Sequence, residues 1–69
     1  MAGLKYYERF KRLEKLIRLK ATGSPKELAK KFEVSERTIY RLIESIELAN
    51  NKKIKFSYEE NSYIFFDEN

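Results

Sequence analysis

Two arginines, Arg37 and Arg41, stand four residues apart in a segment whose apolar residues recur with helical spacing. On a helix this spacing places both side chains on one face, one turn apart and opposite the apolar side that includes Ile39. A guanidinium group is planar and carries five donors, so it binds phosphate oxygens or the O6 and N7 atoms of guanine through paired hydrogen bonds. The segment is therefore the candidate contact with a nucleic acid. The alternative is a solvated face on which the arginines pair with Glu36 or Glu44.

The rest of the chain must position this helix. Its hydrophobic periodicity predicts a mainly α fold, with three helices followed by a C-terminal β-hairpin, in a single domain over residues 1–69. The helices are expected at about residues 4–21, 25–32 and 36–49, and the hairpin at about residues 53–66.

The first expected helix is amphipathic, with one apolar stripe at spacings of three and four residues. The stripe consists of Tyr6, Phe10, Leu13, Ile17 and Ala21, with Leu16 beside it. Gly23 is expected to end this helix, because glycine adopts a left-handed conformation without penalty. Ser24, Pro25 and Glu27 then form the sequence of a capping box and predict the start of the second helix.

From residue 53 the apolar period changes from 3.6 to two, which predicts two strands. Five residues are expected on one face of the hairpin: Ile54, Phe56, Tyr58, Tyr63 and Phe65. Two strands alone are not stable in water, so this face must pack on the helices.

Composition limits the classes of function. The 69 residues include no cysteine and no histidine, which excludes disulfides and the usual zinc sites, so no metal and no cofactor is expected. All 15 lysines and arginines lie in residues 1–55 beside seven acids, so that part carries +8, whereas the last fourteen residues carry −4. A basic body favours a polyanionic partner. No signal pattern or membrane-length apolar run is present, so we expect a cytoplasmic protein without a membrane partner.

Four positions match the pattern of a helix-turn-helix motif: the small residue Ala29, the apolar turn residue Val34, and the core residues Ile39 and Leu42. With the preceding helix and the following hairpin, about residues 4–66 resemble the winged helix-turn-helix superfamily. The string VSERTIYR at residues 34–41 is similar to the small bacterial type that opens deoxyribose-operon-repressor-like and biotin-operon-repressor-like regulators.

The resemblance has one departure. Glu33 occupies the turn position that is often glycine in this pattern. If that position has positive φ, a residue other than glycine costs about 1 kcal/mol there. A winged variant with an altered turn would avoid the cost.

The resemblance implies sequence-specific binding of double-stranded DNA by a small bacterial-type transcriptional regulator, associated with the nucleoid, whose helix 36–49 enters the major groove. Base contacts are expected from Arg37, Arg41, Thr38 and Tyr40. Contacts to the DNA backbone are expected from Ser35, Lys26, Lys52, Lys53 and Lys55. The tip of the hairpin, residues 59–62, is acidic, so we expect a wing that packs more than it reads, with Asn61 or Ser62 at most touching the DNA backbone.

A single recognition helix selects a genomic site poorly, so a homodimer on two half-sites is the expected remedy. Candidate contacts with a second copy or another partner are Leu19, Leu48, Tyr7 and Phe66. No small-molecule effector is evident. Three other classes of function remain open: a winged-helix module for protein interaction or assembly without specific DNA readout, an RNA-binding protein, and, least favoured, an enzyme. Exposed aromatic residues for base stacking would favour RNA, but the aromatic residues are expected mostly at inward positions.

Overall fold

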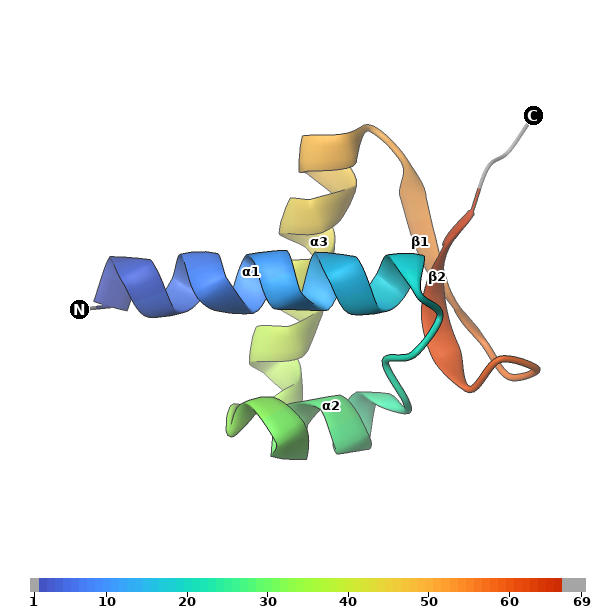
Figure 1. The fold of residues 1–69 in the computed structure, drawn as a ribbon, viewed down its shortest axis with the longest axis horizontal. Coiled ribbons are helices and arrows are strands. Elements are labelled where there is room, and N and C mark those ends of the chain that lie inside the picture. Colours follow the sequence, from blue (N-terminus) through green and yellow to red (C-terminus); the bar gives the residue numbers. More distant parts are fainter. Residues whose placement is uncertain (1, 67–69) are drawn as a thin grey trace.

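The structure is a computed structural model that describes residues 2–66. The fold consists of three helices and one antiparallel hairpin (Figure 1). In chain order the elements are α1 (Ala2–Arg18), α2 (Pro25–Phe32), α3 (Glu36–Asn50), β1 (Lys53–Ser57) and β2 (Ser62–Phe66). Helix α1 crosses α3, α2 packs across the first part of α3, and the hairpin stands beside the end of α1. This arrangement confirms the expected winged helix-turn-helix fold.

All three helices end in the same way, and none of them ends in glycine. Lys20, Glu33 and Asn51 follow the helices in the left-handed conformation, with φ of 56°, 56° and 52°. The ends of α1 and α2 have the hydrogen bonds of a Schellman motif, whereas at the end of α3 the N–H groups of Asn51 and Lys52 both donate to the carbonyl oxygen of Glu47. At the end of α1 the Lys20 N–H donates to the carbonyl oxygen of Ile17 at 3.1 Å, and the Ala21 N–H donates to that of Leu16 at 2.9 Å.

This cap corrects the expected end of the first helix. Helix α1 stops at Arg18 rather than near residue 21, because Lys20 already turns the chain to the left. Gly23 does have positive φ, 77°, but it lies in the connecting segment and caps no helix. Ala21 is therefore exposed and outside the apolar stripe, and Tyr6 is 46% exposed, whereas Leu13 and Ile17 are fully buried.

The start of α2 matches the predicted capping box. The Glu27 N–H donates to Ser24 Oγ at 3.1 Å, and the Ser24 N–H donates to Glu27 Oε1 at 2.8 Å. The Ser24 backbone N–H is also the main reason why the pKa of the Glu27 carboxyl is lowered. Pro25 occupies the first helical position, where its missing N–H leaves no partner unsatisfied.

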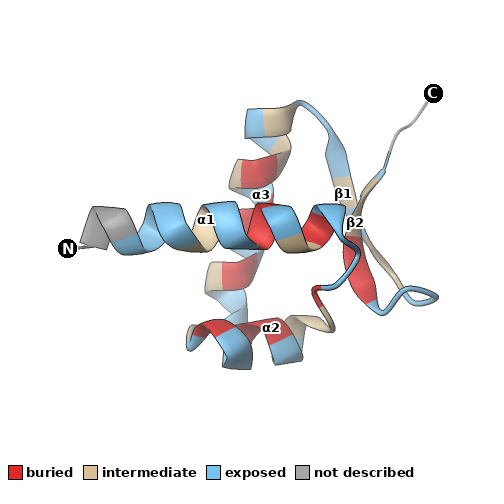
Figure 2. Cartoon of the chain, in the orientation of Figure 1, coloured by how far each residue is buried: buried red, intermediate tan, exposed pale blue. Residues whose placement is uncertain are grey.

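One hydrophobic core joins all the elements, and α3 lies at its centre. Figure 2 shows the buried segments of the helices and the hairpin facing one another. The buried apolar residues are Leu13, Ile17, Leu28, Ala29, Phe32, Ile39, Leu42, Ile43, Ile46 and Tyr63. Among them Ile39, Leu42 and Ile46 of α3 are fully buried. Helix α3 packs against α1, α2 and β1, so these side chains fix its rotation about its own axis.

The hairpin has the predicted alternation, with one error. The register pairs Ile54 with Phe65 and Phe56 with Tyr63, so these four side chains share the face directed at the core. Tyr58, expected on the same face, is 91% exposed, because β1 ends at Ser57 and the chain has already entered the turn. Its ring instead lies edge-on to that of Phe56.

The hairpin is tied to the α1–α2 connection by two buried hydroxyl groups. The Thr22 N–H donates to Ser62 Oγ at 3.0 Å, and the Tyr63 N–H donates to Thr22 Oγ1 at 2.8 Å. Both Thr22 and Ser62 are fully buried. Ser62 was expected in the exposed tip, where it would touch DNA backbone, and this expectation is wrong because Ser62 begins β2 and bonds to Thr22.

No helix among residues 2–66 is both long and apolar enough to cross a membrane.

We predict that Thr22→Val destabilises the fold by about 1–3 kcal/mol, because the buried N–H of Tyr63 loses its acceptor while the side-chain volume is nearly unchanged. Urea denaturation followed by circular dichroism measures the change. Ser57→Ala is the control, since Ser57 Oγ accepts the N–H of the exposed Glu60, and loss of this bond should cost less. An equal loss in the two variants would contradict this role of Thr22.

We also predict that Glu33→Gly and Lys20→Gly each stabilise the protein by about 0.5–1 kcal/mol. Glycine adopts the left-handed conformation of the folded state without strain, and this gain exceeds the loss that comes from the larger entropy of glycine in the unfolded chain. Thermal or urea unfolding checks this. Lys15→Gly, within α1, should instead destabilise by about 1 kcal/mol. Destabilisation by all three glycines would contradict the assignment of strain to the caps.

Candidate nucleic-acid interface

The outer face of α3 carries the two arginines. The buried side chains of Ile39, Leu42 and Ile46 define the inner face, and 100° per residue places Arg37 and Arg41 on the opposite side. Both arginine side chains are exposed. Within the described part of the chain, neither has a carboxylate within ion-pairing distance, so they are not paired with Glu36 or Glu44. Two guanidinium groups thus stand free, one turn apart.

The beginning of α3 is built by a serine cap. Ser35 Oγ accepts the Thr38 N–H at 3.2 Å and lies 3.2 Å from Thr38 Oγ1. Ser35 is exposed and Thr38 is half-buried. The first N–H groups of a helix have no acceptor within it, so an anion that approaches here meets several donors. Backbone donors, two hydroxyl groups and Arg37 are therefore close together at this end of α3.

Tyr40 lies where α3 meets the hairpin. Its side chain is 48% exposed, and it is close enough to Tyr63 of β2 to influence that phenol. Burial, with smaller contributions from Tyr40 and Glu36, raises the pKa of Tyr63 to about 12. Tyr63 therefore remains neutral at any physiological pH, and Tyr40 presents a partly free ring at the edge of the arginine face.

The lysines expected at the DNA backbone are all exposed, but they differ in their surroundings. Lys26 lies in the first turn of α2. Lys55 Nζ lies 4.3 Å above the centre of the Phe66 ring, and Lys52 Nζ lies 5.9 Å from that of Phe65, within the range of cation–π attraction. Lys53 is paired across the hairpin with Phe66. Two lysines of the wing are thus held by aromatic rings, which the sequence pattern had not indicated.

The tip of the hairpin is acidic and projects from the fold. Glu59, Glu60 and Asn61 are all exposed, and the Glu60 N–H donates to Ser57 Oγ. Tyr58, next to them, is almost fully exposed. Four further apolar or aromatic residues, expected at a partner interface, are also exposed: Tyr7 on α1, Leu19 directly after α1, Leu48 on α3 and Phe66 on β2. They are distributed over three elements. Leu48, which is 84% exposed, continues the outer face of α3 beyond Arg41.

A buried carboxylate fixes α1 against the end of α3, which the sequence pattern does not predict. Glu14 is only 7% exposed, and its Oε2 accepts a hydrogen bond from Asn50 Nδ2 at 2.7 Å. Arg18, four residues later, is 3.7 Å from the same carboxylate, and its guanidinium donates to Asn50 Oδ1 at 3.3 Å. The sequence feature that could have indicated burial of Glu14 is its position directly after Leu13 of the apolar stripe. The Asn50 hydrogen bond is the main cause that lowers the pKa of Glu14.

The chain belongs to the HTH domain family, because the model of that family matches residues 9–56, which include α2 and α3 completely. This confirms the resemblance to helix-turn-helix proteins. The family is one of DNA-binding domains rather than enzymes, so the protein is a DNA-binding protein of the regulator type and DNA is its partner. No curated protein and no solved structure gives a significant match to the chain.

We predict that Glu14→Gln lowers the free energy of unfolding by about 1–2 kcal/mol at pH 7, because a charged acceptor is replaced by a neutral one. The folded-state pKa of Glu14 lies below the ordinary 4.5, so its contribution is complete above pH 4.5 and is lost as the pH falls through the folded-state value. Urea denaturation of both proteins at pH 7 and pH 3 measures this. The difference in the free energy of unfolding between the wild-type protein and the variant should be smaller at pH 3 than at pH 7. An equal difference at both pH values would contradict this role of Glu14.

Proposed function

We propose that the protein regulates transcription by binding a specific double-stranded DNA sequence, with the first half of α3 in the major groove. The observation that carries the proposal is the pair of exposed, unpaired guanidinium groups of Arg37 and Arg41 on the side of α3 that faces away from the core. Their spacing along the helix axis, about 6 Å, suits contacts to neighbouring base pairs. In this proposal both arginines bind guanine edges, and Thr38 and Tyr40 lie beside them.

Contacts to phosphates would hold α3 in place. Ser35 and the first N–H groups of α3 are suited to one phosphate, and Lys26, at the start of α2, is suited to another. On the wing side, Lys53 is the lysine most available to a phosphate, because the ammonium groups of Lys52 and Lys55 lie over aromatic rings. The acidic tip of the hairpin repels phosphates, so the wing would contribute through its base and not through its tip.

A second copy of the chain is part of the proposal. An isolated module of this kind buries only about 600–1,000 Å² of its surface on DNA, which is little for the selection of one genomic site. A homodimer would double the contacts and would bind two half-sites with matching symmetry. Leu19, Leu48, Tyr7 and Phe66 are the exposed residues available for such a contact.

The proposal predicts different effects for the two kinds of contact. On a duplex enriched by selection from a random pool, Arg41→Ala should cost about 1–3 kcal/mol and relax the preference at one base position. Lys53→Ala should weaken cognate and random duplexes alike and reduce the salt dependence by about one charged contact. Fluorescence anisotropy with both duplexes at several salt concentrations measures these effects.

Two outcomes would contradict the proposal. If Arg41→Ala weakened cognate and random duplexes equally, the arginine would not read a base. If binding to DNA were absent, or independent of salt, the protein would instead act as a module for protein interaction, with the basic face serving solubility. Lys15→Ala, which removes an exposed lysine of α1, is a matched control for the loss of one charge.

A further inference from the structure

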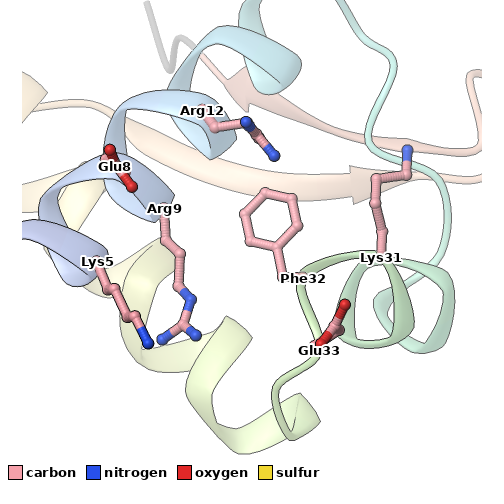
Figure 3. A pocket seen from close by; sticks show the side chains of 7 residues that line it. All are labelled: Lys5, Glu8, Arg9, Arg12, Lys31, Phe32 and Glu33. Atoms are coloured by element: carbon pink, nitrogen blue, oxygen red, sulfur yellow. The ribbon is translucent and has the colours of Figure 1, made fainter. Parts of the chain in front are cut away.

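A second basic feature lies away from the outer face of α3. A hollow of about 270 Å³ opens between the first half of α1 and the end of α2 (Figure 3). Its lining residues are Lys5, Glu8, Arg9, Arg12, Lys31, Phe32 and Glu33. All of them belong to α1, α2 or the cap of α2, and none belongs to α3. Helix α1 packs against the buried side of α3, opposite Arg37 and Arg41.

The hollow contains more positive than negative charge. Four cationic side chains surround it, against the two carboxylates of Glu8 and Glu33. None of these six groups forms an ion pair within the described part of the chain, where the only ion pairs are those of Glu14 with Lys11 and Arg18. Four positive charges around one small space repel one another, and an anion placed among them relieves that repulsion.

The arrangement of the side chains suits a compact anion with several charged oxygens. In Figure 3 the side chains of Arg9, Arg12 and Lys31 lie on different sides of the ring of Phe32, the one apolar residue that lines the hollow. Guanidinium groups bind phosphate oxygens in pairs, and lysine ammonium groups add charge without a fixed geometry. A hollow of about 270 Å³ suits a compact ligand.

We propose that this hollow binds a small free polyphosphate group, a linear diphosphate or triphosphate, between Arg9 and Arg12 of α1 and Lys31 of α2. Lys5 adds a fourth positive charge at the edge. Glu33 and Glu8 set an upper limit on affinity, because each repels the ligand. The inference concerns α1 and α2 alone, and it does not depend on how α3 reads DNA.

The test is a titration of the uniformly ¹⁵N-labelled full chain with sodium tripolyphosphate, followed by NMR. Saturable shifts are expected at residues 5–12 and 31–33 in the wild-type protein. The double variant Arg9→Gln/Arg12→Gln should bind at least tenfold more weakly, since each arginine supplies charge-assisted hydrogen bonds. The matched control Lys15→Gln/Lys20→Gln removes the same charge from exposed positions outside the hollow and should change the affinity less than twofold.

A third variant keeps the proposal testable if the arginine substitutions disturb folding. Glu33→Gln removes a repelling charge and should tighten the binding of tripolyphosphate about twofold or more. No saturable shift in the wild-type protein would overturn the proposal. Equal weakening in the two double variants would also overturn it, because binding would then depend only on total charge.

A duplex titration separates the two sources of phosphate. Arg9→Gln/Arg12→Gln is expected to bind a DNA duplex as the Lys15→Gln/Lys20→Gln control does. If the arginine variant instead lost duplex affinity far beyond the control, the hollow would be a contact for the DNA backbone, and the proposal of a free polyphosphate site would be overturned.

Discussion

Burial of one side of α3 is the constraint on which the rest of the structure depends. Ile39, Leu42 and Ile46 are fully buried, and the helix packs against α1, α2 and β1. A small domain has few apolar side chains with which to build a core, so each of these contacts is needed. Once they are made, α3 cannot rotate, and its opposite side must face solvent. The direction of Arg37 and Arg41 is therefore a consequence of core packing.

Polar contacts then fix the elements around α3 at both ends of the molecule. Thr22 and Ser62 join the hairpin to the α1–α2 connection. Glu14 and Asn50 join α1 to the end of α3. Every buried side-chain nitrogen and oxygen among the described residues has a partner. Since buried polar groups without partners are costly, these pairs specify one arrangement of the elements.

The sequence predicted the parts of the fold that depend on local patterns. The capping box of α2, the inner face of α3 and the shared face of Phe56 and Tyr63 in the hairpin follow from spacing alone. It failed at the end of α1, where Lys20 rather than Gly23 ends the helix, because the hydrogen bonds of the last turn outweigh the conformational preference of lysine. It also failed where distant residues decide. Ser62 and Glu14 are buried with hydrogen-bond partners that are distant in the sequence, Thr22 and Asn50. No local pattern predicts those partners.

The candidate interface was predictable to a similar degree. Helical spacing predicts that Arg37 and Arg41 lie on the outer face of α3, and family membership makes DNA the partner. The rings beneath Lys52 and Lys55 were not foreseen, because cation–π contacts depend on the register of the hairpin. The hollow between α1 and α2 was also not foreseen. Its residues are separated by about twenty positions in the sequence and meet only when the two helices pack.

The central claim is that the guanidinium groups of Arg37 and Arg41 contact the DNA duplex directly. NMR of the arginine Nε–Hε groups tests it most directly, during titration of the full chain with a duplex selected from a random pool. The account predicts large, saturable shifts for Arg37 and Arg41, with Arg9, Arg12 and Arg18 nearly unchanged. Unchanged Arg37 and Arg41 signals in the bound state, while the arginines of α1 shift, would contradict it.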